Sequence, residues 1–338
     1  MNDMSPATAS RYDVADRRPF RLSDVLLRWE TILVLLLIAT IAFNTWISPY
    51  FLDIYNLSDA TFNFSEKAII ALGMALLIIA RDIDLSVAAT IAVASLAMGE
   101  ASAAGAPTPL LVAIGLAVGA VCGAFNGLLV TRFALPSIVV TIGTMSLFRG
   151  IAQVVLGDQA LTSYPASFAA IGQGYIAPHV PVPISFTTFL VLAALFGFVL
   201  HRTALGRRIF ALGNNPIAAR FSGIEVDRIR FWLFVLTGLM AGLAAVFLTA
   251  RIGSTRPNIA IGFELEAVTM VVLGGVSIAG GAGTIPGVVL AVFLLGLTTF
   301  GLSLINVPGI VINVLNGTLL ISAISLPIIV RRLMSRRT

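Results

Sequence analysis

Charged residues are scarce in this sequence, and their scarcity decides what class of protein it encodes. Asp, Glu, Lys and Arg make up only 11% of the 338 residues, whereas 58% are hydrophobic and the mean hydropathy is +1.00. Soluble domains average about 25% charged residues, so the composition excludes an ordinary soluble enzyme of this length. It predicts a chain that lies largely in lipid.

Cysteine and histidine are also nearly absent, with Cys122, His179 and His201 as the complete supply. A lone thiol forms no disulfide or thiolate metal cluster within the chain, and two distant histidines do not predict a metal site. We therefore expect no metal, no cofactor and no enzymatic activity of the chain's own.

The net charge of +5 and the pI near 10 would suggest a nucleic-acid partner in a soluble protein. In a membrane protein such an excess reports orientation, so we expect no nucleic-acid partner.

Apolar runs long enough to cross a bilayer recur along the chain. A hydrocarbon core about 30 Å thick takes about 20 apolar residues per helix, and the sequence predicts an all-α, polytopic membrane protein with about ten such helices. The expected spans are 31–47, 67–80, 87–104, 110–130, 137–156, 185–201, 229–250, 263–280, 284–304 and 308–330. Residues 1–30 are then a cytoplasmic N-terminal segment, 31–330 the transmembrane domain and 331–338 a basic cytoplasmic tail.

Basic residues indicate which side of the membrane each connection faces. Fifteen of the 21 precede the first span, lie between the sixth and seventh spans, or follow the last. Because Lys and Arg collect in cytoplasmic loops, we expect both termini and residues 202–230 in the cytoplasm, and ten spans satisfy that parity. Residues 157–184 contain no Lys or Arg and are expected outside. Counting the spans from a cytoplasmic N-terminus places residues 81–86 inside the cell, unless they form a non-helical break within the bundle beside a polar cavity.

Charged residues are missing from the middles of most expected spans. A transported ion, a voltage sensor or a proton relay normally leaves such charges within the membrane, so we expect a neutral solute. Four amides, Asn126, Gln153, Asn313 and Asn316, could hydrogen-bond it, although polar side chains equally tie one helix to another. Glycines also recur at intervals of four, a spacing that lets helices pack closely: Gly115, Gly119, Gly123 and Gly127, and again Gly238 and Gly242.

The connection after the sixth span predicts a short helix of its own. Asn215 followed by Pro216 is typical of a helix start, and Gly223 is a typical stop, which leaves about two turns between them. A helix this short is marginal in water, so we expect it to dock onto something.

A second connection, residues 273–287, carries six glycines and one proline and should break any helix. It lacks the Lys-Ser/Thr pair of a phosphate-binding loop, and no such loop occurs elsewhere in the chain. ATP, if it drives this protein, must bind to another chain. We take five of the glycines as conformational hinges: Gly274, Gly275, Gly280, Gly281 and Gly283.

Four ordered motifs between about residues 60 and 330 resemble a known family. They are 71–74 with 83–86, 125–130 with 136 and 141–145, 205–224, and 272–277 with 280–283. The chain resembles the permease subunits of ribose-type monosaccharide ABC importers, which include permeases for galactose, xylose, rhamnose and the signal autoinducer-2. The resemblance implies a type II-like permease bundle in the bacterial inner membrane. It also implies three kinds of partner besides membrane lipid: two ATP-binding cassette domains, a periplasmic sugar-binding protein, and a second permease subunit, identical or paralogous.

The same resemblance assigns roles to residues. The helix expected after Asn215 is similar to the family's coupling helix, whose signature is close to Asn-Pro-Glu-Ala-Ala-Arg-Leu-Ser-Gly, and Ile217 replaces the acid of that signature. Contacts with the ATPase are assigned to Gly206, Arg207, Arg208, Asn215, Pro216, Ile217, Ala218, Ala219, Arg220, Ser222 and Gly223. The solute path is assigned to Asp84, Ser86 and Thr141 from the motifs, together with Asn126, Gln153, Asn313 and Asn316. Arg81-Asp82 stands where many relatives have two glycines.

Within the family, residues 251–257 and 306–311 look most like rhamnose permeases, so the main interpretation is an importer of rhamnose. Autoinducer-2 permeases, which share the arginine at position 81, and ribose- or xylose-type permeases are the alternatives. An ion-coupled secondary transporter is the alternative of another class, and it requires buried charges in mid-span.

Overall fold

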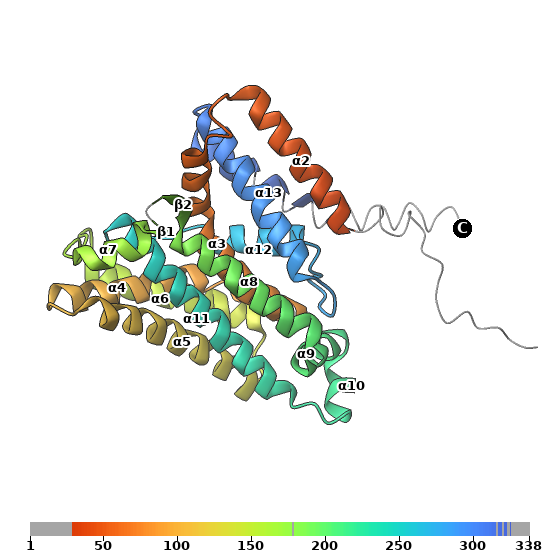
Figure 1. Ribbon diagram of the computed structural model, residues 1–338. Helices are drawn as coiled ribbons and strands as arrows, with labels where there is room; N and C mark the ends of the chain where they lie inside the picture. The colour runs from red at the N-terminus through yellow and green to blue at the C-terminus, as the bar shows by residue number, and fades with distance from the viewer. Residues whose placement is uncertain (1–28, 178, 316, 320, 323–324, 326–338) are drawn as a thin grey trace, which may run out of the picture.

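The computed structural model describes residues 29–177, 179–315, 317–319, 321–322 and 325, and these form an all-α bundle with one short β-hairpin (Figure 1). The elements are α2 (Trp29–Ile47), α3 (Ile54–Ile79), α4 (Val87–Ala103), α5 (Thr108–Arg132), α6 (Ser137–Leu156), α7 (Ala166–Gln173), β1 (Tyr175–Ala177), β2 (Val180–Pro183), α8 (Ile184–Arg202), α9 (Ala204–Asn214), α10 (Pro216–Phe221), α11 (Val226–Ile252), α12 (Phe263–Leu273) and α13 (Ile285–Leu304). Most of the expected N-terminal segment and the whole 331–338 tail lie outside the described residues.

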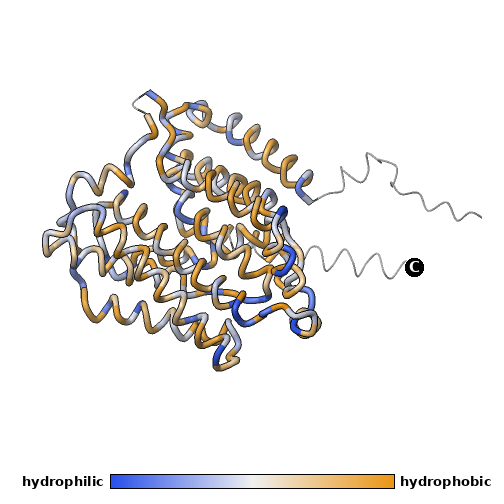
Figure 2. The backbone as a smooth tube through the Cα atoms, turned by 60° about the horizontal axis from the view of Figure 1, so that its bottom comes forward, coloured by the Kyte–Doolittle hydropathy of each residue, from blue (hydrophilic) through white to orange (hydrophobic). Residues whose placement is uncertain are grey.

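Seven helices in the described part of the chain are long and apolar enough to cross a membrane: α2, α3, α5, α6, α8, α11 and α13. Helix α4 and a segment at Gly309–Leu319 are shorter apolar helices, and α12 has 11 residues. These ten elements lie where the sequence predicted spans, so the all-α polytopic fold is confirmed. Figure 2 shows that the helices are mainly hydrophobic and that hydrophilic stretches gather in the connections.

Helix α3 passes through the middle of the bundle, and every residue from Ala68 to Ile79 is buried. It packs against α8, α11, α12 and α13, as expected for a helix that is apolar on all sides. Its start corrects the sequence prediction, which treated 48–66 as a polar connection. The helix instead begins at Ile54, where the Asp53 carboxylate accepts hydrogen bonds from the backbone N–H groups of Tyr55 and Asn56.

The earlier start of α3 places two charged residues inside a helix long enough to span the membrane. Glu66 and Lys67 lie midway along α3, so the expectation of charge-free spans does not hold for the central helix. The expected eighth span, 263–280, is also shorter than predicted, because α12 ends at Leu273 and Gly275 has a φ of 85°, a left-handed conformation that glycine adopts at no steric cost.

The glycines spaced by four join α5 to α11. A Cβ atom at Gly119 would collide with the carbonyl oxygen of Gly238, and one at Gly123 would lie 3.0 Å from the Cα of Gly238. Both helices therefore approach to backbone contact, as the small-residue spacing predicted.

The bundle has two dissimilar ends. Helix α7 and the antiparallel β1–β2 hairpin lie at one end, and α9 and α10 lie at the other (Figure 1). Residues 157–184 and 202–230, which were predicted to face opposite sides of the membrane, are thus separated by the length of the bundle.

Candidate functional site

Residues 203–223 form two short helices at an angle, which we call the elbow. Thr203 caps α9 by accepting a hydrogen bond from the N–H of Gly206. Asn215 joins the helices, and its Oδ1 accepts from the N–H groups of Ile217 at 3.0 Å and Ala218 at 3.1 Å. The predicted start at Pro216 is confirmed, and α10 ends at Phe221, shortly before Gly223 turns the chain with a φ of 80°.

The elbow is held against the bundle by the glycine-rich connection. The N–H of Gly281 donates to the carbonyl of Ile79, the last residue of α3, at 2.9 Å. The side chain of Asn214 donates to the carbonyl of Gly281 at 3.3 Å. Any Cβ atom at Gly213 would collide with the Ile79 carbonyl oxygen, so glycine is required for this approach. Three segments far apart in the sequence, the end of α3, the end of α9 and residues 274–284, therefore meet at one point.

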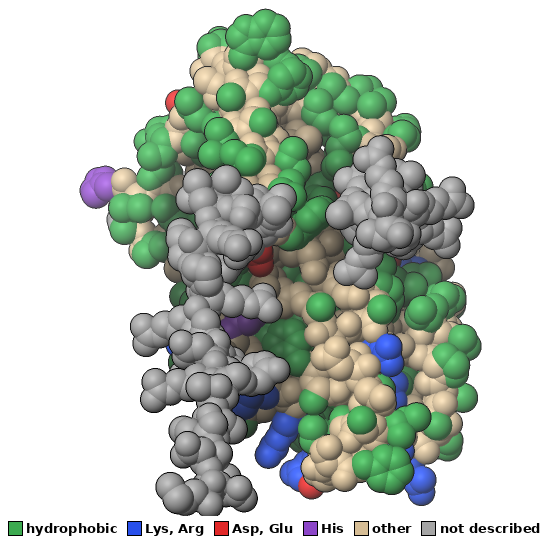
Figure 3. Space-filling model, turned by 90° about the vertical axis from the view of Figure 1, so that its right-hand side faces the viewer, with side chains coloured by type: hydrophobic (Ala, Val, Ile, Leu, Met, Phe, Trp, Pro, Cys, Tyr) green, Lys and Arg blue, Asp and Glu red, His purple; other side chains and the backbone are tan. Residues whose placement is uncertain are grey.

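The outer face of the elbow is apolar at its tip and basic around it. Ile217 is 70% exposed and Phe221 is 90% exposed, whereas Ala219 is buried on the inner face. Arg207 and Arg208 are exposed on α9, and basic side chains gather in the lower part of Figure 3, which views this end of the molecule. Two large apolar side chains are therefore exposed on α10.

The break between α3 and α4 is tied to the start of α11. Asp82 is 2% exposed and forms two hydrogen bonds of 2.7 Å with the guanidinium of Arg230. Arg81 has a φ of 74° and donates from Nε to the carbonyl of Ala279 at 2.6 Å. The backbone at Arg81 is left-handed, a conformation that glycine would adopt without strain.

Four residues predicted for the solute path come together beside this break. Asp84 Oδ1 accepts from the N–H and hydroxyl of Ser86, at 2.9 and 2.7 Å, and Asn126 donates to the Ser86 hydroxyl at 2.8 Å. Thr141 donates to the carbonyl of Ile83 at 3.3 Å. The side chains of Asp84, Ser86, Asn126 and Thr141 are all buried, so the arrangement links α4, α5 and α6. Gln153 is exposed near the far end of α6, Asn313 is exposed on the short helix Gly309–Leu319, and Asn316 lies outside the described residues.

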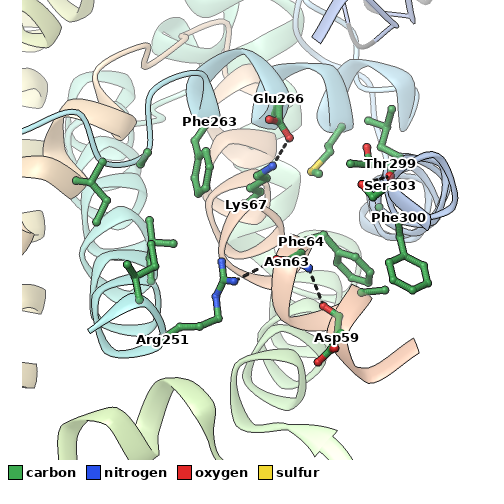
Figure 4. A pocket seen from close by; sticks show the side chains of 18 of the residues that line it. Asp59, Asn63, Phe64, Lys67, Arg251, Phe263, Glu266, Thr299, Phe300 and Ser303 are labelled. Carbon is green, nitrogen blue, oxygen red and sulfur yellow. Dashed lines mark hydrogen bonds and ion pairs between the residues drawn. The ribbon is translucent and has the colours of Figure 1, made fainter. Parts of the chain in front are cut away.

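A cavity of about 770 Å³, lined by both charged and apolar side chains, opens at the other end of the bundle, between the first half of α3, the end of α11, α12 and the end of α13 (Figure 4). Lys67 Nζ lies 2.6 Å from Glu266 Oε2 and 4.8 Å from the centre of the Phe263 ring. Arg251 donates from Nε to Glu66 at 2.8 Å and from Nη1 to Asn63 at 3.1 Å. Two ion pairs thus face this cavity or back its wall.

Sequence reasoning missed the cavity, although a signal was present. Asn56, Asp59, Asn63 and Lys67 follow one another at intervals of three or four and all line it. That interval places them on one face of a helix, continuous with the apolar run that follows. A polar stripe at helical spacing therefore marked a helix with one hydrated face, where the composition alone suggested a loop.

The described chain is thus a polytopic bundle with an exposed elbow at one end and a cavity at the other, an architecture consistent with a membrane permease. Residues 56–324 match the family model described as the permease component of the branched-chain amino acid transport system. The chain belongs to this family of importer permeases, in agreement with the resemblance drawn from its motifs.

Three named relatives indicate which importer permeases this chain resembles. The autoinducer 2 import system permease protein LsrD of Yersinia enterocolitica is 36% identical over 299 residues, which cover 87% of this chain and 89% of that protein. LsrD of Salmonella typhimurium is 35% identical over 300 residues (87% and 89%), and LsrD of Escherichia coli K12 is 36% identical over 299 residues (87% and 90%). No solved structure matches the chain. These relatives are permease subunits of import systems, not enzymes.

Proposed function

We propose that this chain is the membrane-spanning subunit of an ATP-driven importer for a small neutral sugar-like solute, and that an autoinducer-2-type solute is favoured over rhamnose. The named relatives support that preference, since they are autoinducer 2 permeases and this chain matches them over most of their length. The rhamnose interpretation rested partly on residues 251–257. Within that segment Thr255 is buried and hydrogen-bonded to Ser95 and Tyr164, each at 2.6 Å, so it serves packing and does not argue for a particular sugar.

The elbow is the observation that carries the proposal. It has the residues of a coupling helix, and its capped start is held firmly against α3 and the glycine-rich connection. Its apolar tip, with Ile217 in place of an acid, suits an apolar contact on the ATPase better than an ion pair. ATP hydrolysis in two separate cassette domains would push on this elbow in each of two paired permeases, and the bundles would alternate between outward and inward access.

The orientation follows from the elbow. If the elbow meets the ATPase in the cytoplasm, the start of α2 lies on the same side. Trp29 Nε1 donates to the carbonyl of Leu273 at 2.8 Å, and Glu30 accepts from Thr284 at 2.8 Å, beside the connection that holds the elbow. The cavity end, with α7 and the hairpin, then faces the periplasm, where a binding protein would deliver the solute.

Uptake into proteoliposomes tests the proposal. The permease is assembled with its ATPase and binding protein, and labelled autoinducer-2, rhamnose and ribose are offered with and without internal ATP. We expect ATP-dependent uptake, with autoinducer-2 preferred. Gly223→Pro should abolish it without removing the protein from the membrane, because proline holds φ near −65° and this turn requires 80°; deletion of 216–222 should act alike. Uptake driven by a proton or sodium gradient without ATP, or normal uptake by the elbow variants, would contradict the proposal.

A further inference from the structure

We infer that the cavity between α3, α11, α12 and α13 is a binding chamber, within this protomer, for an uncharged polyhydroxylated solute. The inference rests on the proposed transport function and names the site at which the solute is held. Of the residues predicted from the sequence for the solute path, those that the structure describes do not line this cavity.

The charges of the chamber balance. Three basic side chains line it, Lys67, Arg251 and Arg256, and three acidic side chains line it or back its wall, Asp59, Glu66 and Glu266. Three bases and three acids could form three ion pairs, and two of these are present: Lys67 with Glu266 and Arg251 with Glu66. An ion entering the chamber would have to compete with these pairs. A neutral polyol can donate to the carboxylates and amide oxygens and accept from the cations while both pairs remain.

One buried hydroxyl in the chamber wall has no partner. Ser254 is 5% exposed and lines the cavity, yet its Oγ makes no hydrogen bond in the described structure. Glu66 Oε2, which lies behind Arg251, is likewise buried without a partner. Buried polar atoms are normally satisfied by protein, water or ligand. The Ser254 hydroxyl is therefore a free group for a solute hydroxyl.

Apolar surface completes the chamber. Phe64, Phe263 and Phe300 all line it, and Figure 4 shows Phe64 and Phe300 on the α13 side of the cavity and Phe263 beside Lys67. Ligand pockets typically combine apolar and aromatic walls with a few polar groups in about 300–1,000 Å³, a range that includes this cavity. The C–H faces of a sugar ring would lie on the aromatic rings, and its hydroxyls would reach the polar wall.

The chamber is also connected to the elbow. Both α3 and α12 supply its walls, and both lead to the point where Gly281 contacts Ile79 and Asn214. Because α12 is only 11 residues long, the polar backbone at its ends lies in the bundle, which is tolerated where it is buried in protein or lines a cavity. A displacement of α9 would be passed to both walls of the chamber at once.

Protection of an introduced thiol tests the chamber in the assembled permease–ATPase complex. Asn258 is exposed and lines the cavity, so Asn258→Cys in a Cys122→Ala background places a single reactive thiol there. We expect autoinducer-2 or rhamnose to slow maleimide labelling as its concentration rises. Leucine is the comparison probe, because a zwitterion carries the charges that the paired chamber should reject.

Two serine substitutions separate binding from folding. Ser254→Ala removes the unpartnered hydroxyl of the chamber, and Ser185→Ala removes another unpartnered hydroxyl, 1% exposed, on α8 outside it. Neither change should lower stability. Ser254→Ala should raise the solute concentration that gives half-maximal protection about tenfold, which corresponds to a loss of about 1.4 kcal/mol of binding free energy. Ser185→Ala should leave that concentration unchanged.

Absence of protection by the neutral solutes, or protection by leucine instead, would overturn the inference that this cavity binds the solute. ATP-dependent uptake without protection would refute the chamber alone, whereas protection without ATP-dependent uptake would refute the proposed function.

Discussion

Replacing Arg230 with methionine should destabilise the bundle much more than the same change at Arg228, two residues earlier on α11. Arg230 pairs with Asp82, whose side chain is 2% exposed, and is itself 25% exposed. Breaking a buried pair on one side costs about 3–5 kcal/mol because a buried charge loses its partner. The partial exposure of Arg230 allows some water to replace it, so we expect a loss of about 3 kcal/mol.

Arg228 supplies a matched control. It pairs with Glu225 at 3.0 Å, but the two side chains are 71% and 67% exposed. Exposed pairs of this kind contribute about 0–1 kcal/mol, so Arg228→Met should be close to neutral. A double variant, Asp82→Asn with Arg230→Met, removes both charges and should recover much of the loss.

The chain contains its own reporter of unfolding. Cys122 is the only cysteine and is 7% exposed, so its thiol should react with maleimide only when the bundle opens. Labelling rates across a denaturant series in detergent give the free energy of opening for each variant. A loss below about 1 kcal/mol for Arg230→Met, where breaking a buried pair should cost several, would refute the reasoning. So would a double variant no more stable than Arg230→Met.

Two further changes test the elbow and the glycine contact. Asn215→Ala removes the acceptor for two N–H groups at the start of α10 and should destabilise that helix by about 1 kcal/mol. ATPase activity stimulated by the binding protein should fall, whereas Ser146→Ala, on α6 outside the elbow, should retain it. Gly119→Leu inserts a side chain where backbones touch and should cost at least about 1–3 kcal/mol, measured by Cys122 labelling. Gly143→Leu on α6, where a Cβ meets no atom within 4 Å, should be tolerated by the isolated subunit.

Features set by local pattern were predictable from the sequence, and features set by distant contacts were not. The turn at Asn215 and Pro216 follows from capping chemistry within four residues, and the α5–α11 contact follows from glycine spacing. By contrast, no local pattern pairs Asp82 with Arg230 or Glu66 with Arg251, because the partners are 148 and 185 residues apart. The start of α3 was misplaced because its polar residues lower the hydropathy of a segment whose hydrated face lines a cavity.

The same contacts suggest a way in which the proposed solute-binding end and the proposed ATPase-binding end could act together in this tightly packed bundle. Helix α3 is buried along its second half and continuous from Lys67 to Ile79, so a push at Ile79 would be carried along its axis toward Lys67. The glycine-rich connection has left-handed residues at Gly275, Gly280 and Gly281, and it packs closely against the end of α9. One wall of the cavity is therefore joined to the elbow by a buried helix and the other by a glycine-rich turn. A movement of α9 would displace these walls unequally, and unequal displacement is what opens or closes a cavity between them.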